Sequence, residues 1–176
     1  MMIGFQVTAI PTEVAQQARA MRRSPQYGHP AYEELLSEAA PCRHCLRLIR
    51  AGEHALLFTY DPFRGDARPL PGPVYIHAEP CIRYRESNEF PAELRDSPRT
   101  LAAYGTERRI LGEILVPANG DFEGGMASLA SNSDVGYVHV RSTTAGCFTF
   151  RAERAREHAI GNGSILPVSR LKNTPR

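Results

Sequence analysis

Two short segments of the chain carry side chains that bind metals or react as thiols. Cys42 and Cys45 lie three positions apart in the run PCRHCLR, and His77 and Cys81 follow in the run GPVYIHAEPC. Zinc in proteins takes four ligands drawn mostly from thiolates and imidazoles, and a Cys-x-x-Cys pair supplies two of them. The other two come from His77 and Cys81 if the chain between the segments folds back. The spacing therefore predicts a structural, zinc-type Cys3His site at Cys42, Cys45, His77 and Cys81, in a binding or regulatory module.

The same cysteines allow two other interpretations. Cys42 and Cys45 share an apolar helical stripe with Leu46 and Ile49, and free cysteine is among the most buried residue types, so both can be plain core residues with the function elsewhere. In a thiol oxidoreductase, Cys42 would be a thiolate stabilised by a helix dipole, and Cys45 the resolving thiol. No thioredoxin-like βαβ pattern precedes the pair. The sequence leaves open whether the protein is an enzyme.

Other residues carry weaker signals. Cys147 and His139 would face each other across a hairpin as a nucleophile and its base, but no motif orients the imidazole. His44, inside the Cys-x-x-Cys pair, can reach a ligand or support one. The expected helix also places Arg43, Arg47 and Arg50 on one face, which either meets solvent or binds an anion.

Composition limits the class of protein. The chain has 176 residues, of which 42% are hydrophobic and 23% charged, and its net charge is +2. We expect a single α+β domain over residues 1–160 and a poorly ordered tail over residues 161–176. The small net charge gives no indication of a nucleic-acid partner, and no apolar run has the length of a membrane span.

The first residues do not resemble a signal peptide, so we expect a cytoplasmic protein. Partners and oligomeric state stay open.

Hydrophobic periodicity predicts a largely antiparallel sheet of about six short strands with three or four short helices. The helices are expected at residues 12–23, 32–39, 41–50 and 97–104, with one further helical turn at 126–130. The strands are expected at residues 4–10, 54–60, 74–78, 109–116, 135–142 and 147–152. The last two should form a hairpin, and the strands at 54–60 and 74–78 should be neighbours.

The motifs resemble an uncharacterised bacterial family known only as a domain of unknown function. The resemblance rests on PCRHCLR at residues 41–47, GEHALLFTYDPF at 52–63, GPVYIHAEPC at 72–81 and YVHVRSTTAGCFTFRAER at 137–154. It implies no activity, substrate or cofactor. It places all four cysteines, with His77 and His139, inside the resembling segments.

Overall fold

The computed structural model describes residues 4–63, 70–85 and 88–154. Within these ranges the chain forms ten strands in three antiparallel sheets and two α-helices. The strands are β1 (Phe5–Thr8), β2 (Tyr32–Leu35), β3 (Ala40–Pro41), β4 (Leu48–Ile49), β5 (His54–Tyr60), β6 (Gly72–His77), β7 (Arg99–Tyr104), β8 (Ile110–Val116), β9 (Tyr137–Ser142) and β10 (Phe148–Arg154). The helices are α1 (Thr12–Met21) and α2 (Phe122–Ala130), and 3-10 turns occur at Ala92–Leu94 and Thr106–Arg108.

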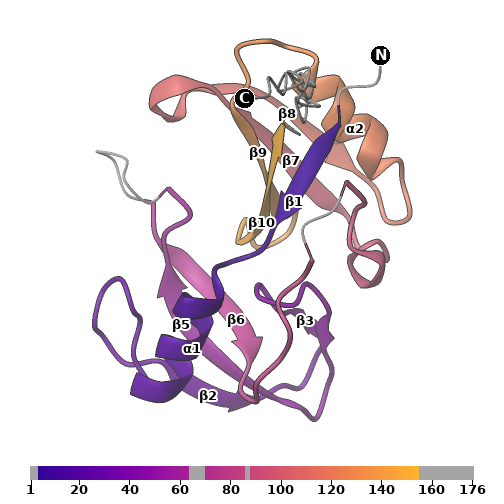
Figure 1. Ribbon diagram of the computed structural model, residues 1–176. Helices are drawn as coiled ribbons and strands as arrows, with labels where there is room; N and C mark the ends of the chain where they lie inside the picture. Colours follow the sequence, from indigo (N-terminus) through magenta and orange to yellow (C-terminus); the bar gives the residue numbers. More distant parts are fainter. Residues whose placement is uncertain (1–3, 64–69, 86–87, 155–176) are drawn as a thin grey trace, which may run out of the picture.

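Strands β1, β10, β9, β7 and β8 form one sheet in that order, and α2 covers one of its faces (Figure 1). We call these elements the five-stranded half. Alternate residues such as Val138 and Val140 on β9 point into its core, where Phe122 and Met126 of α2 meet them. The Asp121 side chain accepts a hydrogen bond from a backbone N–H in the first turn of α2, which is a favourable helix start.

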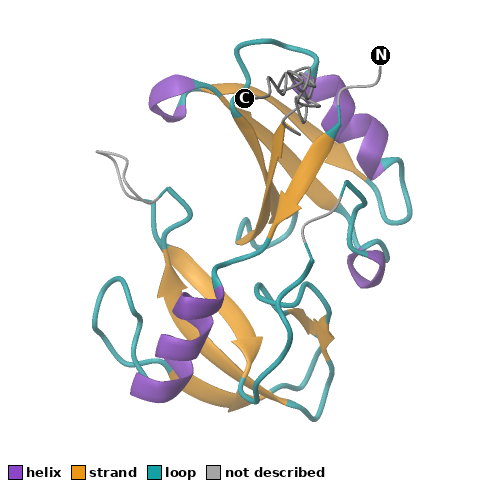
Figure 2. Cartoon of the chain, in the orientation of Figure 1, coloured by secondary structure: helices purple, strands orange, loops and turns teal. Residues whose placement is uncertain are grey.

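Strands β2, β5 and β6 form the second sheet, and α1 packs against it (Figure 2). With β3 and β4, these elements make up the three-stranded half. Its central strand, β5, has the sequence HALLFTY and is paired on both edges. Ala55, Leu56 and Phe58 are buried and Leu57 is half-buried, so both faces of the strand are covered, which accounts for its nearly continuous apolar run. The predicted pairing of residues 54–60 with 74–78 is confirmed by the antiparallel register of β5 and β6.

The fold class expected from the sequence is wrong in its balance of elements. The described residues are mostly β, with ten strands where about six were expected and two α-helices where three or four were expected. The helix at residues 12–23 exists as α1, and the turn at 126–130 is the end of α2. The hairpin of β9 and β10 is confirmed.

None of the three remaining predicted helices forms: two of these segments contain strands, and the third is a turn between two short strands. Residues 32–39 contain good helix formers, but Tyr32–Leu35 pairs with β5 as an edge strand. Residues 99–104 follow a Ser-Pro pair that is typical of a helix start, yet they form an inner strand between β9 and β8. Because both faces of this strand are buried, its sequence lacks the alternation of apolar and polar residues that would distinguish a strand from a helix. In residues 41–50, two very short strands, β3 and β4, flank a turn. Tertiary pairing overrides helix propensity in each case.

The two halves have separate hydrophobic clusters. No helix among the described residues is long and apolar enough to span a membrane. The tail expected at residues 161–176 lies outside the described residues, and the single-domain expectation for residues 1–160 stays a prediction.

Candidate metal centre

Cys42 and Cys45 lie in the tight turn between β3 and β4. The N–H of Leu46 donates to the carbonyl of Cys42, and the N–H of Cys42 donates to the carbonyl of Arg47, both at 2.9 Å. Leu46 adopts a left-handed conformation with φ of 54°, which costs roughly 1 kcal/mol for a residue other than glycine. Its side chain offsets this cost, because it is buried in the core of the five-stranded half. The turn therefore presents both cysteines on the side of the three-stranded half.

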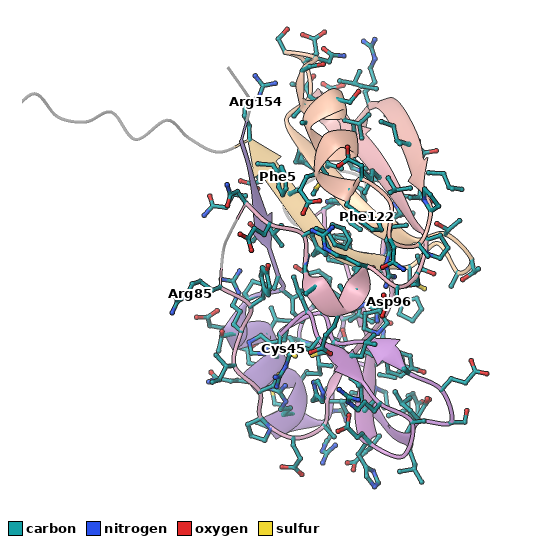
Figure 3. The ribbon with its side chains drawn as sticks, turned by 90° about the vertical axis from the view of Figure 1, so that its right-hand side faces the viewer. Phe5, Cys45, Arg85, Asp96, Phe122 and Arg154 are labelled. Carbon is teal, nitrogen blue, oxygen red and sulfur yellow. The ribbon has the colours of Figure 1, made fainter. Side chains whose placement is uncertain are left out.

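His77 ends β6, and Cys81 follows four residues later. The turn and β6 are joined by a backbone hydrogen bond of 2.9 Å from the N–H of Arg43 to the carbonyl of Tyr75. Because His77 is two residues beyond Tyr75 on the strand, its ring reaches the cysteines of the turn. Figure 3 shows Cys45 near the level at which the two halves meet, whereas Phe122 lies within the five-stranded half.

The structure brings the four predicted ligands together. Their donor atoms all lie within 4.8 Å of one another. The sulfurs of Cys42 and Cys81 are 3.9 Å apart, and Cys45 Sγ is 3.5 Å from His77 Nδ1. Tetrahedral zinc with bonds of about 2.3 Å to sulfur and about 2.0 Å to nitrogen separates two sulfurs by about 3.8 Å and a sulfur and a nitrogen by about 3.5 Å. These two edges thus have the lengths of a zinc tetrahedron.

The short distances between the sulfurs shift the pKa values of the Cys42 and Cys81 thiols. The pKa of Cys42 is lowered, because the thiols of Cys45 and Cys81 donate hydrogen bonds to its sulfur. The pKa of Cys81 is raised, because its thiol is the donor to Cys42 and Cys45 and a second negative charge beside them is unfavourable. Several thiolates can coexist here only if a cation balances their negative charge, and a bound divalent metal ion supplies that positive charge.

Residues outside the predicted set hold the ligands in place. Arg19 of α1 donates from Nη2 to Cys81 Sγ at 3.3 Å and from Nε to the carbonyl of His77 at 3.1 Å. Glu53 Oε2 lies 3.9 Å from His77 Nε2, so a carboxylate faces the ring nitrogen that points away from the cysteines. Carboxylates in this position fix the tautomer and the orientation of metal-binding histidines.

His44 makes the contact with the site that its position in the sequence suggested. Its Nδ1 is 3.2 Å from Cys81 Sγ, and its Nε2 is 3.2 Å from Thr12 Oγ1. Burial, together with the Arg19 guanidinium, lowers the pKa of His44, so the ring is neutral at pH 7. The tautomer with hydrogen on Nδ1 satisfies both contacts, because it donates to the sulfur and accepts from the threonine hydroxyl. Nothing in the spacing of Thr12, Arg19 or Glu53 could have marked them, because they come from other elements.

The turn also corrects two sequence-based arguments. Cys42 is not at the start of a helix, so the helix dipole invoked for a reactive thiolate is absent, and its side chain is 0% exposed. The expected arginine face does not exist either. Arg43 is buried and donates to the carbonyls of Phe148 and Pro41 at 2.9 and 2.6 Å.

His139 and Cys147 lie apart from the metal cluster, on the β9–β10 hairpin, and both line one cavity. His139 is buried among the rings of Phe63, Tyr104, Tyr137 and Phe148, with centroids 4.7 to 5.1 Å away. Burial lowers the pKa of His139 to about 3, with Arg151 and Arg108 contributing. Among the described residues no carboxylate orients this ring, so its setting does not match a catalytic dyad.

Comparison with known proteins agrees with the motif resemblance. The family described as "Protein of unknown function (DUF1203)" matches residues 39–154. The chain belongs to this family. The matched region contains all four cysteines, His77 and His139. No curated protein and no solved structure matches the chain at a significant level.

Proposed function

We propose that this DUF1203 protein is a zinc-stabilised binding module in which Cys42, Cys45, His77 and Cys81 hold one zinc ion. The observation that carries the proposal is the packing of three sulfurs and one imidazole nitrogen within 4.8 Å. All four tetrahedral positions are then filled by protein, which is typical of a structural site and leaves no position for a substrate. The ion would tie the β3–β4 turn to the end of β6.

The chemistry of the surrounding residues supports a closed site. Three thiolates and one neutral imidazole around Zn²⁺ carry a net charge of −1, and Arg19 places its guanidinium against Cys81, the sulfur with the most accessible side chain of the three. A hydrogen bond from a cation to a thiolate lowers the basicity of the sulfur and protects it from protonation. The guanidinium of Arg19 would thus balance the net charge of −1 on the zinc site.

Metal analysis of pairs of variants tests the proposal. We expect the purified protein to contain about one zinc per chain, and Cys81→Ser to lose most of it. Cys147→Ser is the matched control, because Cys147 lies outside the cluster, and it should keep the full amount. If Cys81→Ser fails to fold, cobalt(II) added to the chelator-treated native protein should show the absorption of a tetrahedral thiolate complex. Wild-type protein with only trace metal after growth with zinc, or equal metal contents in the two variants, would contradict the proposal.

The competing interpretation, in which the cysteines are only core residues, makes a different prediction. It expects no metal, and a modest loss of stability in Cys42→Ser that added zinc or chelator does not change. The metal proposal expects chelator to destabilise the native protein and zinc to restore it, because an ion that binds only the folded state stabilises it by mass action.

A further inference from the structure

A cavity of about 240 Å³ lies between the end of β5 and the turn of the β9–β10 hairpin, and none of the four proposed zinc ligands lines it. Its walls include the rings of Tyr60, Phe63, Phe148 and His139 and the side chain of Arg141, with Cys147 at the hairpin turn. We call it the aromatic cavity. An apolar cavity of about 150 Å³ accommodates benzene, so this one has room for a single ring with one small substituent.

The aromatic walls are uncharged. Burial lowers the pKa of His139 to about 3, so its ring is a neutral imidazole at pH 7. The rings of Tyr60 and Phe148 lie 5.9 Å apart, and those of Phe63 and His139 lie 4.7 Å apart, so the walls are held by ring contacts of their own. A planar ligand can add to such an arrangement by stacking or edge contacts.

The cavity also contains a cation, Arg141, that has no counter-ion among the described residues. Arg141 is half-buried, and burial lowers its pKa. Its guanidinium lies 5.6 Å from the Tyr104 ring, and among the described residues no carboxylate lies within 4.0 Å of it. By contrast, the half-buried Arg95 forms an ion pair with Glu123. A desolvated guanidinium beside a cavity is a recognition group for a carboxylate.

The rest of the lining agrees with an anionic ligand. Among the described residues, no aspartate or glutamate lines the cavity. The nearest acidic residue along the chain, Asp61, is buried and engaged by the N–H of Phe63 at 2.9 Å and by the Tyr27 hydroxyl at 3.3 Å. Arg108 lies over the Phe63 ring at 4.1 Å, and so adds positive charge close to this wall.

We propose that the aromatic cavity binds a small planar ring that carries one carboxylate, with the ring against Tyr60, Phe63 and Phe148 and the carboxylate on Arg141. This site is separate from the proposed zinc site and does not depend on it. The volume of the cavity suits one ring, and the Arg141 guanidinium, which has no carboxylate partner among the described residues, selects the anion.

Benzoate is the probe ligand, and the rate at which Cys147 is alkylated reports whether the aromatic cavity is occupied. Because Cys147 lines the cavity, a bound ring should slow its alkylation by iodoacetamide, a reagent that is neutral and does not compete for Arg141. Mass spectrometry of the Cys147 peptide reads this residue alone, so the result holds whether or not the other three cysteines bind metal. The ionic strength is held constant with sodium chloride throughout.

We expect benzoate to slow the alkylation of Cys147 saturably. Benzyl alcohol (the ring without the charge) and inorganic phosphate (the charge without the ring) should protect about tenfold less well or not at all. Arg141→Gln should raise the half-saturating benzoate concentration about tenfold or more, whereas the exposed control Arg109→Gln should leave it unchanged. Equal protection by benzyl alcohol or by phosphate, or no protection by benzoate, would overturn the proposal. These comparisons on the unaltered protein decide the matter even if Arg141→Gln does not fold.

Discussion

Two histidines in similar local sequences, YIH at residues 75–77 and YVH at 137–139, have different chemical roles because their neighbours differ. His77 ends an outer strand with Cys45 on one ring nitrogen and Glu53 near the other. His139 lies in an inner strand, 1% exposed, and its Nε2 has no hydrogen-bond partner. A histidine that binds a metal needs an oriented, accessible ring nitrogen, whereas a histidine ring buried among aromatic side chains stays uncharged and contributes only packing contacts.

The buried His139 should make the folded protein less stable as the pH falls. Its pKa is about 3 in the folded protein against about 6.5 in the unfolded chain, so the unfolded state binds the extra proton. The contribution of His139 is fully present above pH 6.5 and is lost as the pH falls toward 3. Between these values the free energy of unfolding should fall by up to about 1.4 kcal/mol per pH unit because of this one group.

Urea unfolding of wild-type protein and of His139→Phe at pH 7, 6 and 5 measures this effect. The phenylalanine keeps the aromatic contacts and removes the titration. The difference in unfolding free energy between the two proteins should change toward acid pH in favour of the variant, while titrations shared by both cancel. Parallel pH profiles would show that His139 is protonated in the folded state at no cost.

At the scale of elements, α1 is attached to the candidate metal centre near both of its ends. Thr12, in its first turn, contacts His44, and Arg19, in its last turn, contacts Cys81 and the carbonyl of His77. The helix also buries Val14, Ala15 and Ala18 in the core of the three-stranded half. It therefore acts as a support for the ligands as well as a cover for the sheet.

Removing the contact at the end of α1 should weaken metal binding without abolishing it. We expect Arg19→Met to lower the affinity for zinc by about tenfold to a hundredfold, which is the usual effect of losing a group that supports a ligand. Arg22→Met is the matched control, because Arg22 lies one turn further and pairs with Glu33 on the surface. Competition with a chromophoric chelator gives both affinities. An unchanged affinity in Arg19→Met would mean that the arginine stabilises only the helix.

The same elements show how far sequence reasoning extends. The strand at residues 54–60 could be predicted because its apolar run is bounded by turn residues. The turn around Cys42 and Cys45 could not, because its buried residues happen to recur at helical spacing while its strands contain only two residues each. The four donor residues could be selected from their chemistry and spacing. Arg19 and Glu53 could not, because only the tertiary fold brings them to the cluster.

For the whole molecule, the Cys-x-x-Cys turn is the piece that joins the two halves. Leu46 is buried in the core of the five-stranded half, whereas Cys42 and Cys45 are buried in that of the three-stranded half. Arg43, between them, donates to the carbonyl of Phe148 on β10 and accepts from the N–H of Ile10. A metal that rigidifies this turn would therefore stabilise the contact between the halves as well as the local loop.

Removing the metal should then loosen a defined part of the molecule. After treatment with chelator we expect faster hydrogen exchange at the amides of Ile10, Arg43, Leu46 and Tyr84, because the partner carbonyl of each or the amide itself lies in the turn. The amides that pair β7 with β8 should keep their protection, since those strands pack on α2 within the other core. Exchange measured by mass spectrometry with and without zinc gives the comparison. Equal loss of protection in β7 and β8 would show that the five-stranded half cannot fold without the metal, and an unchanged turn would show that the metal does not hold the halves together.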